Sequence, residues 1–200
     1  MWIVSAKFEE LVESFISNEI GISENFLTKE LAQLLQQDLQ DLNSDNRMFP
    51  AGIGNSDAKD AHQKTRSDKI FWLDKKNNSI NEQAFTEQVE DFIAYLNKTC
   101  YTGINAYEFH YALYDTGSYY HRHRDQFKSN NDRKYSLISY LNDDWVAADG
   151  GALLIYQDDK TETILPNIQK AVFFKSDELE HEVSIAQRPR MSITGWLKRV

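Results

Sequence analysis

The sequence predicts an α+β fold in which helices cover one sheet of a sandwich or barrel of β-strands. Apolar residues recur at helical spacing within the first hundred residues. After Asn105, short runs rich in Tyr, Ile, Val, Phe and Leu alternate with polar or glycine-containing turns. Helices that precede a set of strands are expected to pack on one side of the resulting core. The 200 residues carry no repeat or Pro/Gly linker, so we expect one domain, 1–200, with helical support in 1–100 and most of the strand core in 101–200.

Three helices are predicted in the first half of the chain. The first spans 6–15, where Phe8, Leu11 and Phe15 share one face, and a short strand at 20–22 follows it. Thr28 is the expected N-cap of a second helix, in which the leucines between positions 31 and 42 form one apolar stripe. The third helix is expected at about 81–97 on the same grounds.

The remaining elements are a loop and a series of strands. Residues 51–65 are small and polar and predict a mobile loop, and an apolar run at 70–73 predicts a strand after it. Further strands are expected at 106–114, 118–122, 135–141, 152–156, 161–165, 171–175, 182–185 and 190–197.

The charge of the chain argues against a nucleic-acid partner. The formal net charge is −9 and the pI is near 5.0, and an acidic chain repels phosphate backbones unless a local basic patch overrides the total. We interpret the one basic cluster as a solvated rim that Asp125 and Asp132 balance; it comprises Arg122, Arg124, Lys128, Arg133 and Lys134.

The sequence also predicts a cytoplasmic protein without a membrane partner. No apolar run approaches the length of about 18 residues that a membrane span needs. The first ten residues lack a basic segment followed by a long apolar stretch, which a secretory signal requires. The single cysteine, Cys100, has no partner for an internal disulfide.

A candidate metal site begins at His123 and Asp125. Residues two apart point the same way from an extended strand, and the distant His181 can complete three ligands. Two histidines and one carboxylate, with the opposite positions open, form the ligand set of non-haem Fe(II) oxygenases. His121 shares the same face of a regular strand but would lie ~13 Å from Asp125 at ~3.3 Å per residue, so we expect it at the rim. Taken alone, a surface histidine beside a solvated aspartate is the simpler explanation of the His123 pair.

Arg190 strengthens the metal-site interpretation. It begins a run in which Arg190, Ser192, Thr194 and Trp196 share one face, whereas the apolar Met191, Ile193 and Leu197 share the other and should face a core. A guanidinium fork suits a carboxylate, and a charge inside a barrel needs a partner. A bound dicarboxylate would supply that partner, and an acidic side chain is the alternative.

Two further features lie close to these residues in the predicted fold. Ser136, Ile138 and Tyr140 share one face of the strand at 135–141, so the phenol of Tyr140 can reach the same ligand carboxylate. A core tyrosine bonded to backbone is the simpler alternative. Gly150-Gly151 is expected to make the turn before 152–156, with a close backbone approach as the other possible use.

The joint order of these motifs resembles the prolyl 4-hydroxylase group of Fe(II)/2-oxoglutarate dioxygenases, and within it the hypoxia-factor prolyl hydroxylases and their bacterial relatives. The resemblance covers roughly Arg66 to the C-terminus. It rests on the runs at 66–73, at 114–120 leading into 123–125, and at 139–145, 150–153, 181–183 and 190–196.

The resemblance implies a fold and a set of site residues. The core would be a double-stranded β-helix (a jelly roll, cupin-like) covered by the N-terminal helices. Iron would be held by His123, Asp125 and His181. Arg190 would pair with the distal carboxylate of 2-oxoglutarate, helped by Tyr140, with four further cofactor-binding positions at Thr194, Tyr114, Ile138 and Leu153.

The resemblance also assigns residues to the substrate. Arg66 and Asp68 match the end of a loop that closes over a peptide, which makes 51–65 the expected lid, and Trp196 is placed on the substrate side. The implied cofactors are Fe(II), the cosubstrate 2-oxoglutarate and O₂, with ascorbate as a reductant.

The implied activity is hydroxylation of a C–H bond in a prolyl residue of a protein substrate, which yields hydroxyproline, succinate and CO₂. One alternative is a hydroxylase of a free amino acid or another small molecule. A second is a non-catalytic jelly-roll module for binding or sensing, against which the intact set His123, Asp125, His181 and Arg190 argues. A nucleic-acid demethylase uses similar iron chemistry, but the acidic charge disfavours it.

Overall fold

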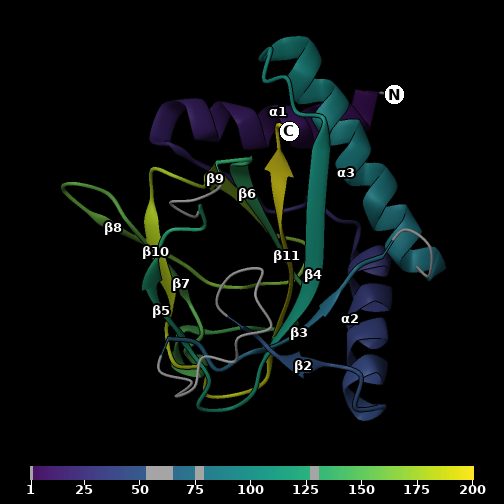
Figure 1. Ribbon diagram of the computed structural model, residues 1–200, viewed down its shortest axis with the longest axis vertical. Coiled ribbons are helices and arrows are strands. Elements are labelled where there is room, and N and C mark those ends of the chain that lie inside the picture. The colour runs from purple at the N-terminus through teal and green to yellow at the C-terminus, as the bar shows by residue number, and fades with distance from the viewer. Residues whose placement is uncertain (1, 53–64, 75–78, 127–130) are drawn as a thin grey trace.

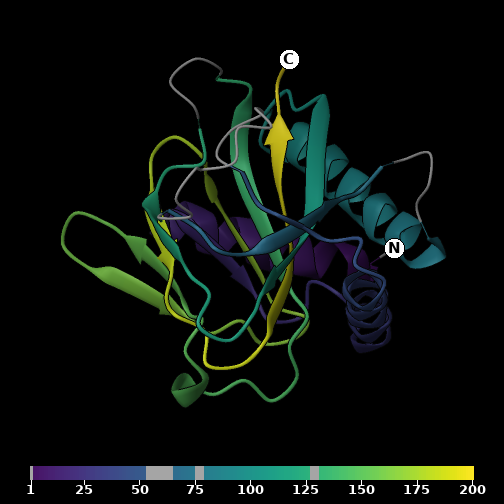
Figure 2. The same ribbon diagram turned by 60° about the horizontal axis from the view of Figure 1, so that its bottom comes forward.

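The chain is arranged in three layers, with helices on one face of a large sheet and a small sheet on its other face (Figure 1). The structure is a computed structural model, and it describes residues 2–52, 65–74, 79–126 and 131–200, without the side chains of 2–5. In Figures 1 and 2 the small sheet lies to the left of the large one, whereas α2 and α3 lie to the right. The helices are α1 (Trp2–Asn18), α2 (Lys29–Ser44) and α3 (Ile80–Thr99), with a short 3₁₀ turn at Ala147–Asp149.

Both sheets are antiparallel, which favours short connections between strands. The large sheet has the order β1 (Ile20–Ser23), β9 (Ala171–Lys175), β6 (Arg133–Tyr140), β11 (Arg190–Lys198), β4 (Ala106–Tyr114), β3 (Lys69–Trp72) and β2 (Phe49–Pro50). The small sheet has the order β5 (Tyr120–His123), β10 (Glu180–Val183), β7 (Leu153–Tyr156) and β8 (Thr161–Ile164). The predicted α+β fold is therefore confirmed.

Local capping interactions fix where the second and third helices begin. The Thr28 hydroxyl accepts a hydrogen bond from the backbone N–H of Leu31 at 3.2 Å, so the predicted N-cap of α2 is confirmed. Ser79 and Glu82 form a capping box, in which each side chain accepts from the other's backbone N–H, at 3.1 and 2.9 Å. Helix α3 therefore begins at Ile80, one residue before the predicted start.

The large sheet has an apolar core on each face. On one face, side chains from all three helices pack against Met191, Ile193 and Leu197 of β11 and their neighbours, as the alternation of that run predicts. Burying one such side chain contributes about 1.5–3 kcal/mol, so this face fixes β11 in register. The other face packs against the small sheet through residues such as Ile138 and Leu153. The candidate site residues line a cavity in this second space.

The structure corrects several predicted boundaries. Strand β5 runs from Tyr120 to His123 and not over 118–122, and β10 runs from Glu180 to Val183 and not over 182–185. Strand β2 was not predicted, because a two-residue strand that contains a proline has no pattern of its own. Positions 53–64 of the predicted lid, and Lys128 of the basic cluster, lie outside the described residues. None of the described helices is long and apolar enough to cross a membrane.

Candidate metal centre and ligand cavity

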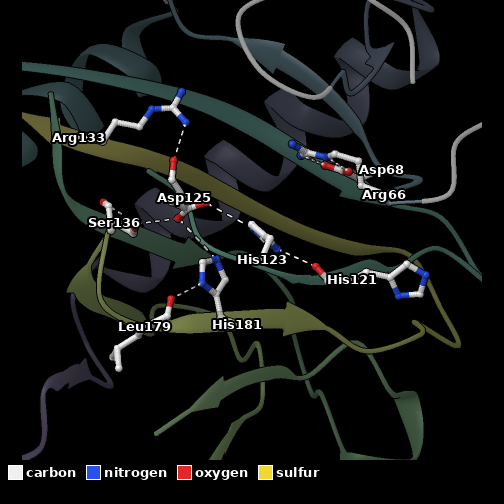
Figure 3. A network of polar contacts seen from close by, with 10 residues as sticks. Arg66, Asp68, His121, His123, Asp125, Arg133, Ser136, Leu179 and His181 are labelled. Carbon is white, nitrogen blue, oxygen red and sulfur yellow. Dashed lines mark hydrogen bonds and ion pairs between the residues drawn. The ribbon is translucent and has the colours of Figure 1, made fainter. Parts of the chain in front are cut away.

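The three predicted metal ligands come together between the two sheets (Figure 3). His123 and His181 are opposite one another in the antiparallel pair of β5 and β10, and their ring centroids are 4.3 Å apart. Asp125 lies in a bend, two residues beyond the end of β5. The prediction that it belongs to an extended strand is therefore wrong. One potential ligand atom from each residue lies within 4.8 Å of the other two.

Backbone carbonyl groups fix the tautomer of both histidines. The Nδ1 of His123 lies 2.7 Å from the carbonyl oxygen of His121, and the Nδ1 of His181 lies 3.3 Å from that of Leu179. A carbonyl oxygen only accepts hydrogen bonds, so each Nδ1 carries the hydrogen and each Nε2 has a free lone pair. Both Nε2 atoms point toward Asp125, which is the orientation that a metal ligand needs.

The carboxylate of Asp125 is buried and held in place from the large sheet. Ser136 of β6 donates a hydrogen bond to its Oδ2 at 2.6 Å, and the guanidinium of Arg133 donates to its backbone carbonyl at 3.2 Å. Burial alone would raise the pKa of Asp125, but positive charge or an N–H at His181 and His123 outweighs it and holds the pKa well below its usual range, and a bound cation would supply the same stabilisation when both rings present lone pairs. The carboxylate is therefore ionised at neutral pH.

These charges and lone pairs fit a cation. The His123 Nε2 is 3.4 Å from Oδ1 of Asp125, and the His181 Nε2 is 3.5 Å from Oδ2. Burial lowers the pKa of His123, so its imidazole is neutral at pH 7 and its lone pair faces an ionised oxygen. Two imidazole nitrogens and a carboxylate oxygen are the donor set that suits Fe(II) with open positions for further ligands.

A β-bulge gives this centre a fourth neighbour that strand alternation does not predict. His181 pairs with His123 and Val183 pairs with Tyr120, so three steps along β5 match two steps along β10. The bulge brings Tyr120 onto the face of His123, where the two rings stack with centroids 3.5 Å apart. His121 is exposed, and its side chain points away from the centre (Figure 3), as expected of a rim residue.

Arg190 is a buried cation near the metal ligands. It is 1% exposed, and no carboxylate among the described residues forms an ion pair with it. Its Nε donates to the carbonyl of Gly151 at 2.8 Å, and its guanidinium carbon lies 4.8 Å from the ring centroid of Tyr114 and 5.1 Å from that of Tyr140. A buried guanidinium without a counter-charge among the described residues is suited to bind the carboxylate of a ligand.

Two residues beside Arg190 support the same conclusion. The hydroxyl of Tyr140 is buried and has no hydrogen-bond partner among the described residues, and burial raises its pKa to about 12. A carboxylate bound at Arg190 would satisfy it. Gly151 has φ +62°, and a Cβ at this position would lie 3.1 Å from Arg190 Cδ. The backbone of Gly151 therefore approaches Arg190 closely, which was the second use predicted for the Gly150-Gly151 pair.

A cavity that opens to solvent connects the metal ligands to Arg190. Of the predicted site residues, it is lined by His123, Asp125, His181, Arg190, Thr194, Tyr114, Ile138, Leu153, Arg66 and Trp196. Tyr140 contacts Arg190 and Asp68 pairs with Arg66, and neither is among the residues that line the cavity.

Asp68 positions Arg66 at one wall of the cavity. Both oxygens of the Asp68 carboxylate accept from the Arg66 guanidinium, at 2.7 and 2.6 Å, and Asp68 is 1% exposed. The guanidinium carbon of Arg66 lies 4.2 Å from the ring centroid of Tyr120. In Figure 3 the pair lies across from the metal ligands, so Arg66 is available to a ligand and Asp68 acts through it.

Four residues of the site were not predicted. His110, Tyr120 and Val183 line the cavity, and Ser136 holds Asp125. His110 shares alternation with Tyr114 four positions later on β4, so the strand pattern could have identified it. Tyr120 depends on the bulge, and its position carries no local signal.

Comparisons with known proteins agree with this geometry. Residues 109–198 match the model of the 2OG-Fe(II) oxygenase superfamily. A curated protein of Ostreococcus tauri, prolyl 3,4-dihydroxylase OGFOD1, is 40% identical over an 80-residue alignment. That alignment covers 32% of this chain and 16% of the length of that protein.

Two solved structures share nearly the whole fold. The crystal structure of a Pseudomonas putida prolyl-4-hydroxylase has a TM-score of 0.87 and 27% sequence identity, and the match covers 96% of this chain and 99% of that one. A prolyl hydroxylase from Trichoplax adhaerens, in complex with a hypoxia inducible factor peptide fragment, has a TM-score of 0.87 at 23% identity, covering 99% and 93%. The neighbours confirm the expected jelly-roll core.

Proposed function

Since this chain is an oxygenase of the 2OG-Fe(II) superfamily, we propose that it hydroxylates a prolyl residue of a protein or peptide. The observation that carries the proposal is the length of the cavity. Arg190 and Trp196 both line it, and six residues of strand separate their Cα atoms by ~20 Å at ~3.3 Å per residue. The short chain of 2-oxoglutarate spans only part of that length, so the residues toward Trp196 remain to contact a second reactant.

The residues of the chain bind and orient the reactants. His123, Asp125 and His181 would hold Fe(II), and the Arg190 guanidinium would hold the distal carboxylate of 2-oxoglutarate. When bound, the metal and cosubstrate supply an oxidation in which O₂, 2-oxoglutarate and a C–H bond give succinate, CO₂ and a C–OH bond.

The cavity walls would protect this chemistry from water. Ile138, Leu153 and Val183 form an apolar wall beside the metal ligands, which excludes solvent and strengthens the charge interactions inside. The stacked pair of Arg66 and Tyr120 lies toward the substrate end. These residues would orient the C–H bond of a substrate toward the metal ligands.

Two relatives support prolyl chemistry. The Pseudomonas putida protein is named as a prolyl-4-hydroxylase, and the Ostreococcus tauri protein as a prolyl 3,4-dihydroxylase. Both names concern a proline ring, and the first belongs to a chain of nearly the same extent as this one. We carry the substrate class over as a proposal on that basis.

The test compares proline-containing peptides with free proline in an assay of succinate release, with mass spectrometry of the product. We expect O₂-dependent succinate release and addition of one oxygen atom to a peptide. His123→Ala should abolish both, whereas the matched His121→Ala, on an exposed side chain, should retain most of the activity. Hydroxylation of free proline alone would replace the peptide proposal with a small-molecule hydroxylase. No coupled turnover with either class would refute prolyl hydroxylation.

A further inference from the structure

His110 is a buried histidine in the cavity wall that neither the metal ligands nor the cosubstrate site uses. It lies on β4, directly opposite Thr194 of β11 and Trp72 of β3. It is 2% exposed, and its ring centroid lies 5.0 Å from that of Trp72 and 5.7 Å from that of Trp196. The imidazole is therefore fixed between two indoles and borders the cavity.

The free nitrogen of this imidazole is a hydrogen-bond acceptor. Its Nδ1 lies 3.0 Å from the carbonyl oxygen of Tyr111, so Nδ1 carries the hydrogen and Nε2 has the lone pair. None of the hydrogen bonds between described residues reaches that Nε2. Because the imidazole lines the cavity, this lone pair is available to a hydrogen-bond donor of a bound ligand.

The imidazole stays neutral at physiological pH. Burial lowers the pKa of His110 to about 4, and the charges of Arg66 and Arg133 act in the same direction, opposed by Asp68. Arg66 is paired with Asp68, and Arg133 with Glu108 at 2.6 Å. A neutral imidazole accepts a hydrogen bond at Nε2 from an uncharged donor such as an amide N–H.

His110 lies farther from Arg190 than Tyr114 does along the cavity wall. Tyr114, which contacts Arg190, lies four residues further along β4, or ~13 Å at ~3.3 Å per residue. Trp72 is 43% exposed, so this end of the wall borders solvent. A substrate entering past Trp72 would meet His110 before it reaches the residues around Arg190.

We propose that His110 is a specificity-determining residue, whose Nε2 accepts a hydrogen bond from a backbone amide N–H of the peptide substrate. The inference rests on the proposed function and adds the group that recognises the substrate backbone. A site with a buried acceptor discriminates against analogues that lack the donor, because the acceptor is then left unpaired.

The test is a double-mutant cycle between His110 and the substrate amides. His110→Phe keeps a ring of similar size and removes the acceptor, whereas His110→Gln keeps an acceptor oxygen. Peptides that the wild-type protein hydroxylates are compared with versions in which single backbone amides are N-methylated. His121→Phe, on an exposed histidine, is the matched control.

We expect one N-methylated position to raise KM about tenfold in the wild type, the scale for a buried group left without its partner. His110→Phe should raise KM for the parent peptide by a similar factor, with no further loss from that N-methyl group. His110→Gln should recover part of the loss, and none of the variants should alter the affinity for 2-oxoglutarate.

Three results would overturn the inference in distinguishable ways. If His110→Phe and N-methylation have additive effects at every position, His110 does not contact an amide, although the proposed function stands. If no single N-methyl group weakens turnover by the wild-type protein, the inference fails. This result does not depend on whether the variants fold. If the wild-type protein hydroxylates no peptide, the proposed function and this inference fail together.

Discussion

Replacement of Arg190 by methionine should remove most of the affinity for 2-oxoglutarate and leave the metal ligands intact. The guanidinium is 1% exposed, and no described carboxylate pairs with it, so the bound cosubstrate would supply its counter-charge. Methionine fills a similar volume without charge, and its side chain is flexible enough to fit the site.

The magnitude follows from the contacts that are lost. Two charge-assisted hydrogen bonds to a buried carboxylate contribute about 1.5–3 kcal/mol each, and breaking a buried ion pair costs about 3–5 kcal/mol. The Kd for 2-oxoglutarate should therefore rise at least about 100-fold. Arg190→Lys keeps the charge but not the planar fork, and should cost about tenfold.

The assay is an anaerobic titration of the Fe(II)-loaded protein with 2-oxoglutarate, in which the visible charge-transfer band of a chelated keto acid is followed. Arg188→Ala is the control, because Arg188 pairs with Asp149 at 3.1 Å and donates to the carbonyl of Asp143, outside the cavity. Thermal unfolding without cosubstrate should show little loss in Arg190→Met, since the variant removes a buried charge without a counter-ion.

Near wild-type affinity in Arg190→Met, or an equal loss in Arg188→Ala, would refute this reasoning. The first result would mean that the carboxylate binds elsewhere. The second would assign the role to Arg188, which is the other arginine close to the start of β11.

Three further predictions concern residues that support the site. Ser136→Ala removes the hydrogen bond to Asp125 and should weaken Fe(II) binding about 10- to 100-fold, measured by competition with a chelator. Gly151→Ala places a Cβ at φ +62° against Arg190, costs about 1–2 kcal/mol of stability, and should raise the Kd for 2-oxoglutarate in the same titration. His110 has its pKa lowered from 6.5 to about 4, so the unfolded chain binds a proton that the folded protein excludes, and stability falls as pH falls through this range. Urea unfolding of metal-free protein should lose about 3 kcal/mol from this group between pH 7 and pH 4, and His110→Gln should remove that part of the slope.

Each of these has an outcome that contradicts it. Unchanged metal affinity in Ser136→Ala would mean that Asp125 is held by its other contacts alone. A Gly151→Ala variant that binds 2-oxoglutarate normally would show that the turn can move away from Arg190. An identical pH slope in His110→Gln would mean that His110 takes up its proton in the folded state.

Side-chain alternation made the faces of the long strands predictable from sequence. The apolar set of β11 faces the helices, while Arg190, Thr194 and Trp196 line the cavity, because a nine-residue strand paired on both sides stays regular. The helix that begins after Thr28 was predictable for a similar reason, since a cap and an apolar stripe are both local.

The details around the metal ligands could not be predicted in this way. Strand β5 has only four residues and contains a bulge, so the regular spacing assumed for 121–125 fails there. The bulge depends on pairing with β10, which lies far away in sequence. The stack of Tyr120 on His123 and the burial of Asp68 behind Arg66 follow from such tertiary contacts.

The position of Asp125 links the metal to the spacing of the whole sandwich. The two histidines belong to the small sheet, whereas the serine that holds the aspartate belongs to the large one. A bound ion would therefore link the two sheets at the edge strand β5. Because a ligand that binds only the folded state stabilises it, the ion would also raise the free energy of unfolding. We expect amide hydrogen exchange in β5 to slow on addition of Fe(II), and metal-free chains to be cleaved faster by proteases. Iron supply would then set how long the protein persists as well as how fast it works.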